Sequence, residues 1–319
     1  TQSAGSGIVY KLDKANGNAY IVTNYHVVYN AQANTANHIS DEINLYLYGK
    51  ESSAYAIPAT YIGGSMLYDI AVLKVENNDI IRSSNVRAAD FADSNDVSVL
   101  DTAIVIGNPE AKGISATVGH VNVQSEYIQM TAADDSTTIE MRVMRIDAAV
   151  NSGNSGGGLY NDEGNLIGIV NAKMSSSSID NIGYAIPSNI AKYVADNILY
   201  YCDGKDNENV YRCLLGITVE AASSDTVYDT ETGKIHIVER VAVKEITSGS
   251  PAASALKAGD VIRSITVGDK TYEVTRIYHI VDIMLNARVG DTVTIAITRG
   301  GTDETVSLTI TDSALTKYN

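Results

Sequence analysis

The sequence has 319 residues, 45% of them hydrophobic and 19% charged, which is enough apolar material for two domains with ordinary cores. Its formal net charge of -15 argues against nucleic acid or an anionic membrane surface as a partner, because phosphate binding needs a local excess of Lys and Arg. No apolar run is long enough to cross a bilayer and the first residues do not resemble a signal peptide, so we expect any export signal or membrane anchor to lie upstream of residue 1.

Short apolar runs separated by turn residues occupy the first 187 residues. They span residues 8–12, 19–28, 43–48, 54–62, 70–75, 97–106, 117–123, 139–146 and 166–170. Many short strands at this spacing predict an all-β sandwich or a pair of barrels. Turn signals such as Gly107-Asn108-Pro109 between the runs agree with this interpretation.

A helical period begins after Pro187. Apolar residues at positions 190, 193, 194, 198 and 201 fall on one helix face, and Ser188 is the expected N-cap. We expect this helix to close a first domain that spans residues 1–201. Residues 202–212 are polar and predict a flexible linker.

A second domain is expected over residues 213–319. Strand-like runs at 214–219, 235–246, 261–267, 292–298 and 305–310 alternate with two expected helices, at about 251–256 and 277–287, which indicates a mixed domain. Residues 220–234 form a polar insertion early in this domain. Cys202 and Cys213 have a spacing that allows a small disulfide loop, and two unpaired thiols are the alternative.

The run 151–158, NSGNSGGG, contains a candidate nucleophile, Ser155. Peptide hydrolysis by a serine needs a base, a carboxylate that orients the base, and backbone donors for the oxyanion. Glycines on both sides of Ser155 leave room for a substrate carbonyl and let N–H groups turn inward, so Gly153 and Ser155 are the expected oxyanion donors. A flexible Gly/Ser linker is the alternative, but this run lies between two apolar strands.

His26 and Asp69 are the candidates for the base and the carboxylate. His26 follows an apolar run, and Asp69 directly precedes another. A lone His is usually structural, and the other four histidines are better explained as surface or packing residues. A buried Asp at position 69 would need a partner such as an imidazole N–H, whereas a turn residue there would not.

Taken together, these segments resemble the signature blocks of the HtrA/Deg proteases. The blocks are TNYHV at 23–27, DIAVLK at 69–74 and GNSGG at 153–157, and further agreement is found at 5–7, 107–109, 146–149 and 183–187. Residues 214–217, LLGI, are similar to the carboxylate-binding loop of PDZ domains, and 249–262 also resemble that domain. Ser152 and Gly158 occupy positions where the family commonly has Pro, which favours a more mobile loop.

The resemblance implies an all-β double barrel of the trypsin/chymotrypsin type, followed by a mixed α+β PDZ domain. It implies a serine endopeptidase, without metal or cofactor, that acts on unfolded or damaged extracytoplasmic proteins. The expected assembly is a homotrimer or larger, with loops around 124–138 and 171–183 that move between inactive and active states. The expected location is secreted, periplasmic or at the cell surface, with a removed N-terminal segment as the anchor.

The resemblance also places two binding sites. The base of the S1 pocket falls at Ala149, with Asn171 on the strand that lines it. Because no Asp stands at the base, a basic P1 side chain would be buried unpaired, and an aliphatic P1 residue is expected. Leu214, Leu215, Gly216 and Ile217 are expected to bind a hydrophobic C-terminus that adds to the domain as a strand. An apolar strand with a turn glycine is the alternative for this segment.

Two other functions remain to be compared with an endopeptidase. One is a chaperone or peptide-binding module that keeps the protease fold while its catalytic loop rests in an inactive form. The second is a metal hydrolase, but the sequence has no His-x-x-x-His or paired Cys-x-x-Cys spacing.

Overall fold

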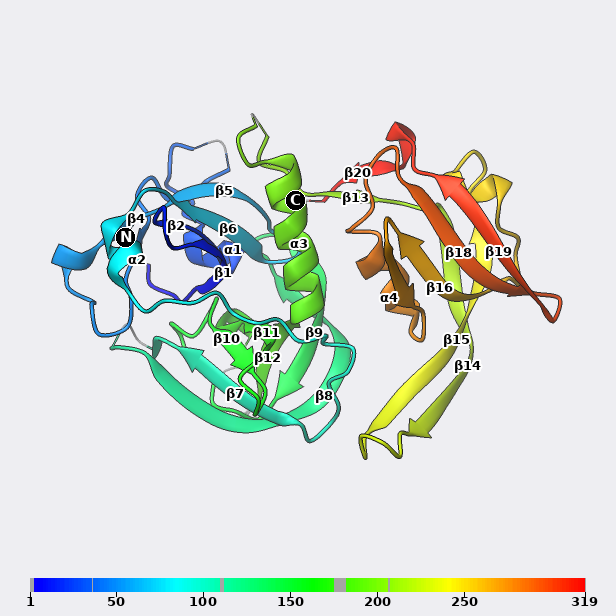
Figure 1. Cartoon of the computed structure of the whole chain (residues 1–319), viewed down its shortest axis with the longest axis horizontal. Coiled ribbons are helices and arrows are strands. Elements are labelled where there is room, and N and C mark those ends of the chain that lie inside the picture. The colour runs from blue at the N-terminus through cyan, green and yellow to red at the C-terminus, as the bar shows by residue number, and fades with distance from the viewer. Residues whose placement is uncertain (1–2, 36, 110–111, 175–181, 206, 319) are drawn as a thin grey trace. The chain divides into compact units, whose positions relative to one another are not determined.

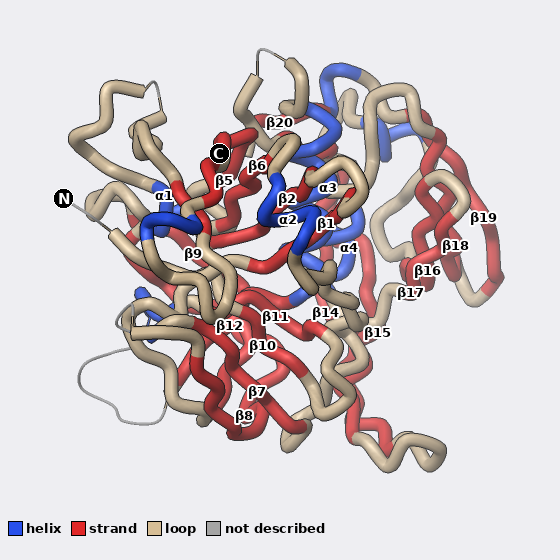
Figure 2. The backbone as a smooth tube through the Cα atoms, turned by 60° about the vertical axis from the view of Figure 1, so that its left-hand side comes forward, coloured by secondary structure: helices blue, strands red, loops and turns tan. Residues whose placement is uncertain are grey.

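The computed structural model describes residues 3–35, 37–109, 112–174, 182–205 and 207–318 (Figures 1 and 2). The chain divides into two compact units, one ending at Val210 and the other spanning Tyr211–Tyr318. Strands dominate both units, as the red segments of Figure 2 show. No helix in the described ranges has the length and apolar character needed to span a membrane.

The first half of unit 1 is an antiparallel sheet with the strand order β1-β2-β6-β5. Its strands are β1 (Ile8–Asp13), β2 (Asn18–Thr23), β5 (Thr60–Ser65) and β6 (Ile70–Val75), and a short ladder joins β3 (Asn44–Leu45) to β4 (Ile57–Pro58). Strand β6 is buried on both faces apart from Lys74, since it pairs with β2 on one side and β5 on the other.

The second half of unit 1 is a closed barrel of six strands in the order β10-β11-β12-β9-β8-β7. The strands are β7 (Thr102–Gly107), β8 (Ser115–Thr131), β9 (Thr138–Ile146), β10 (Gly158–Tyr160), β11 (Leu166–Val170) and β12 (Gly183–Pro187). Strands β8 and β9 form a long hairpin, and Ala133 at its turn is buried against the core of the first sheet. The hairpin therefore joins the two halves of the unit.

Three helices complete the described part of unit 1. They are α1 (Tyr25–Val28), α2 (Asp79–Ser83) and α3 (Ser188–Tyr201), and short 3-10 turns occur at η1 (Ser53–Tyr55) and η3 (Ala172–Met174). Helix α3 contacts β5 and β6 of the first sheet and β11 and β12 of the barrel. The expected N-cap was wrong, because the cap position is Pro187 and the Ser188 hydroxyl instead donates to Ala92 O at 2.8 Å.

Unit 2 contains a sheet in the order β14-β15-β16-β18-β19, with β17 paired to β16. Its elements are β13 (Tyr211–Cys213), β14 (Ile217–Tyr228), β15 (Ile235–Ile246), η4 (Pro251–Ser254), β16 (Val261–Val267), β17 (Lys270–Glu273), α4 (Ile277–Ile283), β18 (Thr292–Arg299), β19 (Thr302–Thr309), η5 (Asp312–Ala314) and β20 (Leu315–Lys317). Helix α4 is shorter than the helix expected over 277–287. The polar insertion 220–234 extends the β14–β15 hairpin, which pairs as far as Tyr228 and Ile235.

One residue of the polar segment 202–212, Asp203, is hydrogen bonded to the first sheet of unit 1. Asp203 accepts hydrogen bonds from the Tyr20 hydroxyl and, at 3.1 Å, from Lys74 Nζ. Cys202 and Cys213 are both free and buried, so the structure has the unpaired thiols and not the disulfide. Burial raises the pKa of the Cys202 thiol to about 12 and that of Cys213 to about 11, which makes both thiols unreactive near neutral pH.

Candidate active site

Strand pairing brings two of the three candidate catalytic residues together. Strands β2 and β6 are antiparallel neighbours, with Thr23 opposite Ala71, so the end of β2 lies beside the start of β6. His26 follows β2 on the single turn of α1, where the sequence had predicted that the strand continues to residue 28, and Asp69 directly precedes β6. Ser155 comes from the glycine-rich turn before β10, in the barrel.

The three side chains form a connected chain of hydrogen bonds. His26 Nδ1 lies 2.7 Å from Asp69 Oδ2, and His26 Nε2 lies 2.9 Å from Ser155 Oγ. The side chain of His26 is 15% exposed and that of Asp69 is 4% exposed. This is the geometry in which an imidazole held by a buried carboxylate can accept the proton of a serine hydroxyl.

Asp69 has an unusual backbone conformation that its surroundings hold in place. Its φ is 50°, a left-handed value that Asp tolerates better than most non-glycine residues. The carbonyl oxygen of Asp69 accepts from Asn24 Nδ2 at 3.0 Å, and Oδ1 accepts from His26 N at 2.9 Å. A buried carboxylate needs such donors to offset its lost hydration, and here they also fix its orientation toward the ring.

Asn171 supplies one more donor to this carboxylate, a contact that the sequence did not predict. Nδ2 donates to Asp69 Oδ2 at 2.6 Å, and Oδ1 accepts from Lys173 N at 3.1 Å. Asn171 is 0% exposed, so its amide is buried against the acid. Its expected place beside the S1 pocket stays a prediction. The feature of the sequence that could have predicted the contact with Asp69 is the position of Asn171 directly after the fully buried strand β11, where a buried amide needs polar partners.

The residues after Asn171 contact the candidate nucleophile and the β8–β9 turn. Ala172 N donates to Ser155 Oγ at 3.1 Å. Lys173 Nζ donates to Ala132 O at 2.7 Å and to Asp135 Oδ1 at 2.8 Å. This short segment therefore connects the site to the hairpin that joins the two halves of unit 1. Residues 175–181 of the expected mobile loop 171–183 lie outside the described part of the chain.

Glycines on both sides of Ser155 have positive φ angles. Gly153 has φ 95° and Gly156 has φ 80°, a region that favours glycine. The N–H groups of Asn154, Gly156 and Gly157 donate to backbone carbonyls, at 2.8–3.0 Å. Those of Gly153 and Ser155 donate to no atom of the described residues, so the two predicted donors are available for a substrate oxygen.

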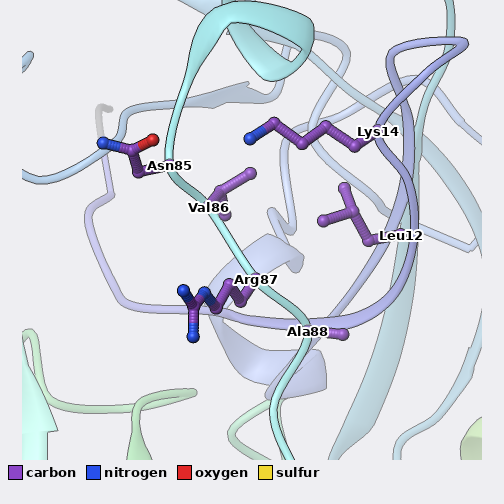
Figure 3. Close-up of a pocket in the computed structure, with 6 residues that line it drawn as sticks. All are labelled: Leu12, Lys14, Asn85, Val86, Arg87 and Ala88. Atoms are coloured by element: carbon purple, nitrogen blue, oxygen red, sulfur yellow. The ribbon is translucent and has the colours of Figure 1, made fainter.

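The remaining predicted residue of the S1 pocket, Ala149, is exposed. Its carbonyl oxygen accepts from Thr117 Oγ1 at 2.8 Å. No hydrogen bond joins it to a charged side chain of the described residues, which fits an uncharged pocket base. A separate surface pocket is lined by Leu12, Lys14, Asn85, Val86, Arg87 and Ala88 (Figure 3). It contains none of the candidate catalytic or binding residues.

The predicted carboxylate loop of unit 2 precedes an open sheet edge. Leu214 is 38% exposed, Leu215 is buried, Gly216 has φ 75°, and Ile217 begins β14. Their N–H groups differ in availability: Leu214 N donates to Ala314 O at 2.8 Å, whereas those of Leu215 and Gly216 donate to no described residue. Strand β14 ends the sheet order and contacts α4. Such an edge, beside a helix, is the geometry to which a peptide strand adds.

Comparison with known proteins agrees with this organisation. Residues 5–169 match the trypsin-like peptidase domain and residues 213–310 match the PDZ domain. The chain is 33% identical to the serine protease Do-like HtrA of Bacillus subtilis over 95% of its length, and 32% identical to the periplasmic pH-dependent serine endoprotease DegQ of Escherichia coli over 83%. It spans 62% and 50% of those relatives, respectively.

Solved structures give the same result. The HtrA-type protease AlgW with a decapeptide superposes with a TM-score of 0.54 at 27% identity, covering 96% of this chain and 82% of that one. The predicted fold class, a trypsin-like domain followed by a PDZ domain, is thereby confirmed. The chain belongs to the HtrA-type family of trypsin-like serine proteases that carry a PDZ domain.

Proposed function

We propose that this protein is a serine endopeptidase in which Ser155 is the nucleophile, His26 the general base and Asp69 the residue that orients His26. The observation that carries the proposal is the 2.9 Å separation of His26 Nε2 and Ser155 Oγ, with Asp69 Oδ2 2.7 Å from the other ring nitrogen. A ring bonded in this way has its Nε2 lone pair directed at the hydroxyl proton.

The proposed reaction follows from these positions. Ser155 Oγ attacks the scissile carbonyl while its proton moves to His26 Nε2, and the N–H groups of Gly153 and Ser155 stabilise the oxyanion. His26 then protonates the leaving amine, which gives an acyl-enzyme on Ser155. A water molecule, deprotonated by the same ring, hydrolyses that ester and restores the hydroxyl.

We expect cleavage after small or medium aliphatic residues. Ala149 offers no charge to pair with Lys or Arg, and burying an unpaired charge costs several kcal/mol, which is roughly a hundredfold or more in kcat/KM. Cleavage sites in unfolded casein, mapped by mass spectrometry, measure this preference. Ala149→Asp is expected to add cleavage after Lys and Arg, and frequent cleavage after basic residues by the unaltered protein would contradict the assignment.

We also expect unit 2 to bind peptides with a free, hydrophobic C-terminus. The unengaged N–H groups of Leu215 and Gly216 support a carboxylate site beside the β14 edge. Fluorescence anisotropy with a labelled peptide ending in Val measures this binding. Amidation of the C-terminus is expected to weaken binding about tenfold or more, because it removes the charge that the N–H groups bind. Equal affinity for acid and amide would refute the site.

Unfolded or damaged extracytoplasmic proteins are the proposed substrates. The periplasmic location named for the Escherichia coli relative supports a secreted, periplasmic or cell-surface location. An upstream anchor and assembly into a homotrimer or larger particle remain proposals. Digestion of reduced casein alongside a stably folded globular protein tests the preference for unfolded chains, which are expected to be cleaved much faster.

A further inference from the structure

Within the described residues, four hydrogen bonds connect Ser6, which precedes β1, to distant parts of the chain. Its N–H donates to Ser155 O at 2.8 Å, and its hydroxyl donates to Gly153 O at 2.8 Å. The same hydroxyl accepts from Asn108 N at 2.9 Å, and the carbonyl of Ser6 accepts from Thr23 Oγ1 at 2.7 Å. Every polar atom of this residue is therefore engaged.

The partners of Ser6 lie on both halves of the candidate site. Gly153 and Ser155 belong to the loop with the nucleophile and the expected oxyanion donors. Thr23 ends β2, just before the turn that carries His26, and Asn108 follows barrel strand β7. Ser6 therefore links the first sheet to the barrel. His26, on the side of the first sheet, and Ser155, on the side of the barrel, meet at the same junction.

The packing around Ser6 leaves little space for the loop to shift. A Cβ atom on Gly5 would lie 2.6 Å from a Val27 methyl and 3.2 Å from Ser155 O. A Cβ on Gly156 would lie 2.2 Å from Ser6 O. The backbone around Ser6 and the backbone around Ser155 can approach this closely only because each has a glycine, Gly5 and Gly156, next to the contact.

We propose that the Ser6 hydroxyl is a positioning group for the oxyanion loop. It restrains the carbonyl of Gly153 and thus the peptide plane between Gly153 and Asn154, which lies between the two planes that carry the N–H groups of Gly153 and Ser155. The residue before Gly153 is Ser152, which leaves the loop backbone freer than a proline would. Within the loop, Asn154 N donates to Asn151 O at 3.0 Å, and the Ser6 hydroxyl adds a restraint from outside the loop. Because its polar atoms are all engaged within the protein, Ser6 is assigned a positioning role and not a catalytic one. It acts through the orientation of the donors, on which transition-state stabilisation depends. This inference rests on the proposed endopeptidase function.

The test compares Ser6→Ala and Ser6→Thr with the unaltered chain. Loss of one oxyanion donor typically costs about a hundredfold or more in kcat. A misoriented oxyanion loop should lose part of this stabilisation. We therefore expect Ser6→Ala to lower kcat about 10- to 100-fold and to change KM by less than about twofold. Ser6→Thr keeps the hydroxyl and is expected to recover most of the loss. The measurements are kcat and KM on a fluorescence-quenched peptide with Val at P1, and the rate of fluorophosphonate labelling.

Ser188→Ala is the matched control. Its hydroxyl also donates to a distant backbone carbonyl, Ala92 O, at 2.8 Å, and this bond does not involve the oxyanion loop. Thermal unfolding of both variants measures the loss of stability. A fall in kcat for Ser6→Ala alone, at equal folded fraction, supports the positioning role.

Two other outcomes overturn the inference, and they are distinguishable. If Ser6→Ala keeps the kcat of the Ser188→Ala control while the unaltered protein is active, the positioning role is wrong and the proposed function stands. If the unaltered protein shows neither turnover nor labelling, the proposed function fails as well.

Discussion

Replacement of Ser155 by Ala is expected to lower kcat for casein hydrolysis by about 10⁴- to 10⁶-fold. The variant lacks the oxygen that forms the acyl-enzyme, and His26 then has no hydroxyl to deprotonate. What remains is binding and oxyanion stabilisation of direct attack by water, which is slow. Casein digestion at matched concentrations of the two proteins measures the effect, and circular dichroism verifies that the variant is folded.

Ser152→Ala is the control for this prediction. Ser152 lies in the same loop but is exposed, so its loss should change kcat only severalfold. Equal, negligible turnover by the unaltered protein and by Ser155→Ala would instead favour the alternative function, a chaperone or peptide-binding module on a protease fold.

Replacement of Asp69 by Asn should lower kcat by about 10⁴-fold. An amide can place an N–H against His26 Nδ1, which favours the tautomer whose proton is on Nε2 and which cannot accept a proton from Ser155. Asn also tolerates the φ of 50° at this position, so the backbone should keep its shape. Steady-state kinetics on the quenched peptide, with thermal unfolding in parallel, measure the effect.

Asp229→Asn is the matched control for this change. Asp229 also accepts from backbone and hydroxyl groups in a turn, at 2.9 Å from Glu231 N and 2.6 Å from Thr232 Oγ1, but it lies in unit 2. Its replacement should leave kcat within about twofold. A loss of less than tenfold in Asp69→Asn would show that the carboxylate does not set the tautomer of His26.

The sequence was most informative where function depends on local motifs. The runs around His26, Asp69 and Ser155 each place a chemically suitable side chain beside a strand. Pairing of β2 with β6 brings His26 and Asp69 together, and the loop before β10 places Ser155 against the ring. Their geometry agrees with the prediction, and their catalytic roles remain to be measured. The need for glycine at positions 153 and 156 could be predicted from the sequence, because glycine is required only where the backbone is left-handed or closely packed.

Other features depend on tertiary contacts that periodicity does not reveal. The direction of the Asn171 amide is decided by Asp69, which is 102 positions away in the sequence, and Ser6 is a common loop residue until its four partners are known. The segment 202–212 has the composition of a linker, yet Asp203 is bonded to Tyr20 and Lys74. Residues 220–229 are exposed almost throughout. Their polar composition therefore gave no indication that most of them pair with β15 as part of strand β14.

Labelling with a fluorophosphonate probe, mapped by mass spectrometry, tests the central claim most directly, because it requires the nucleophile, the base and the oxyanion donors together. We predict a single adduct on Ser155 in the unaltered protein, and labelling slowed by at least about a thousandfold in His26→Ala. The absence of an adduct on Ser155, or equal labelling of that serine with and without the imidazole, would contradict the proposed mechanism.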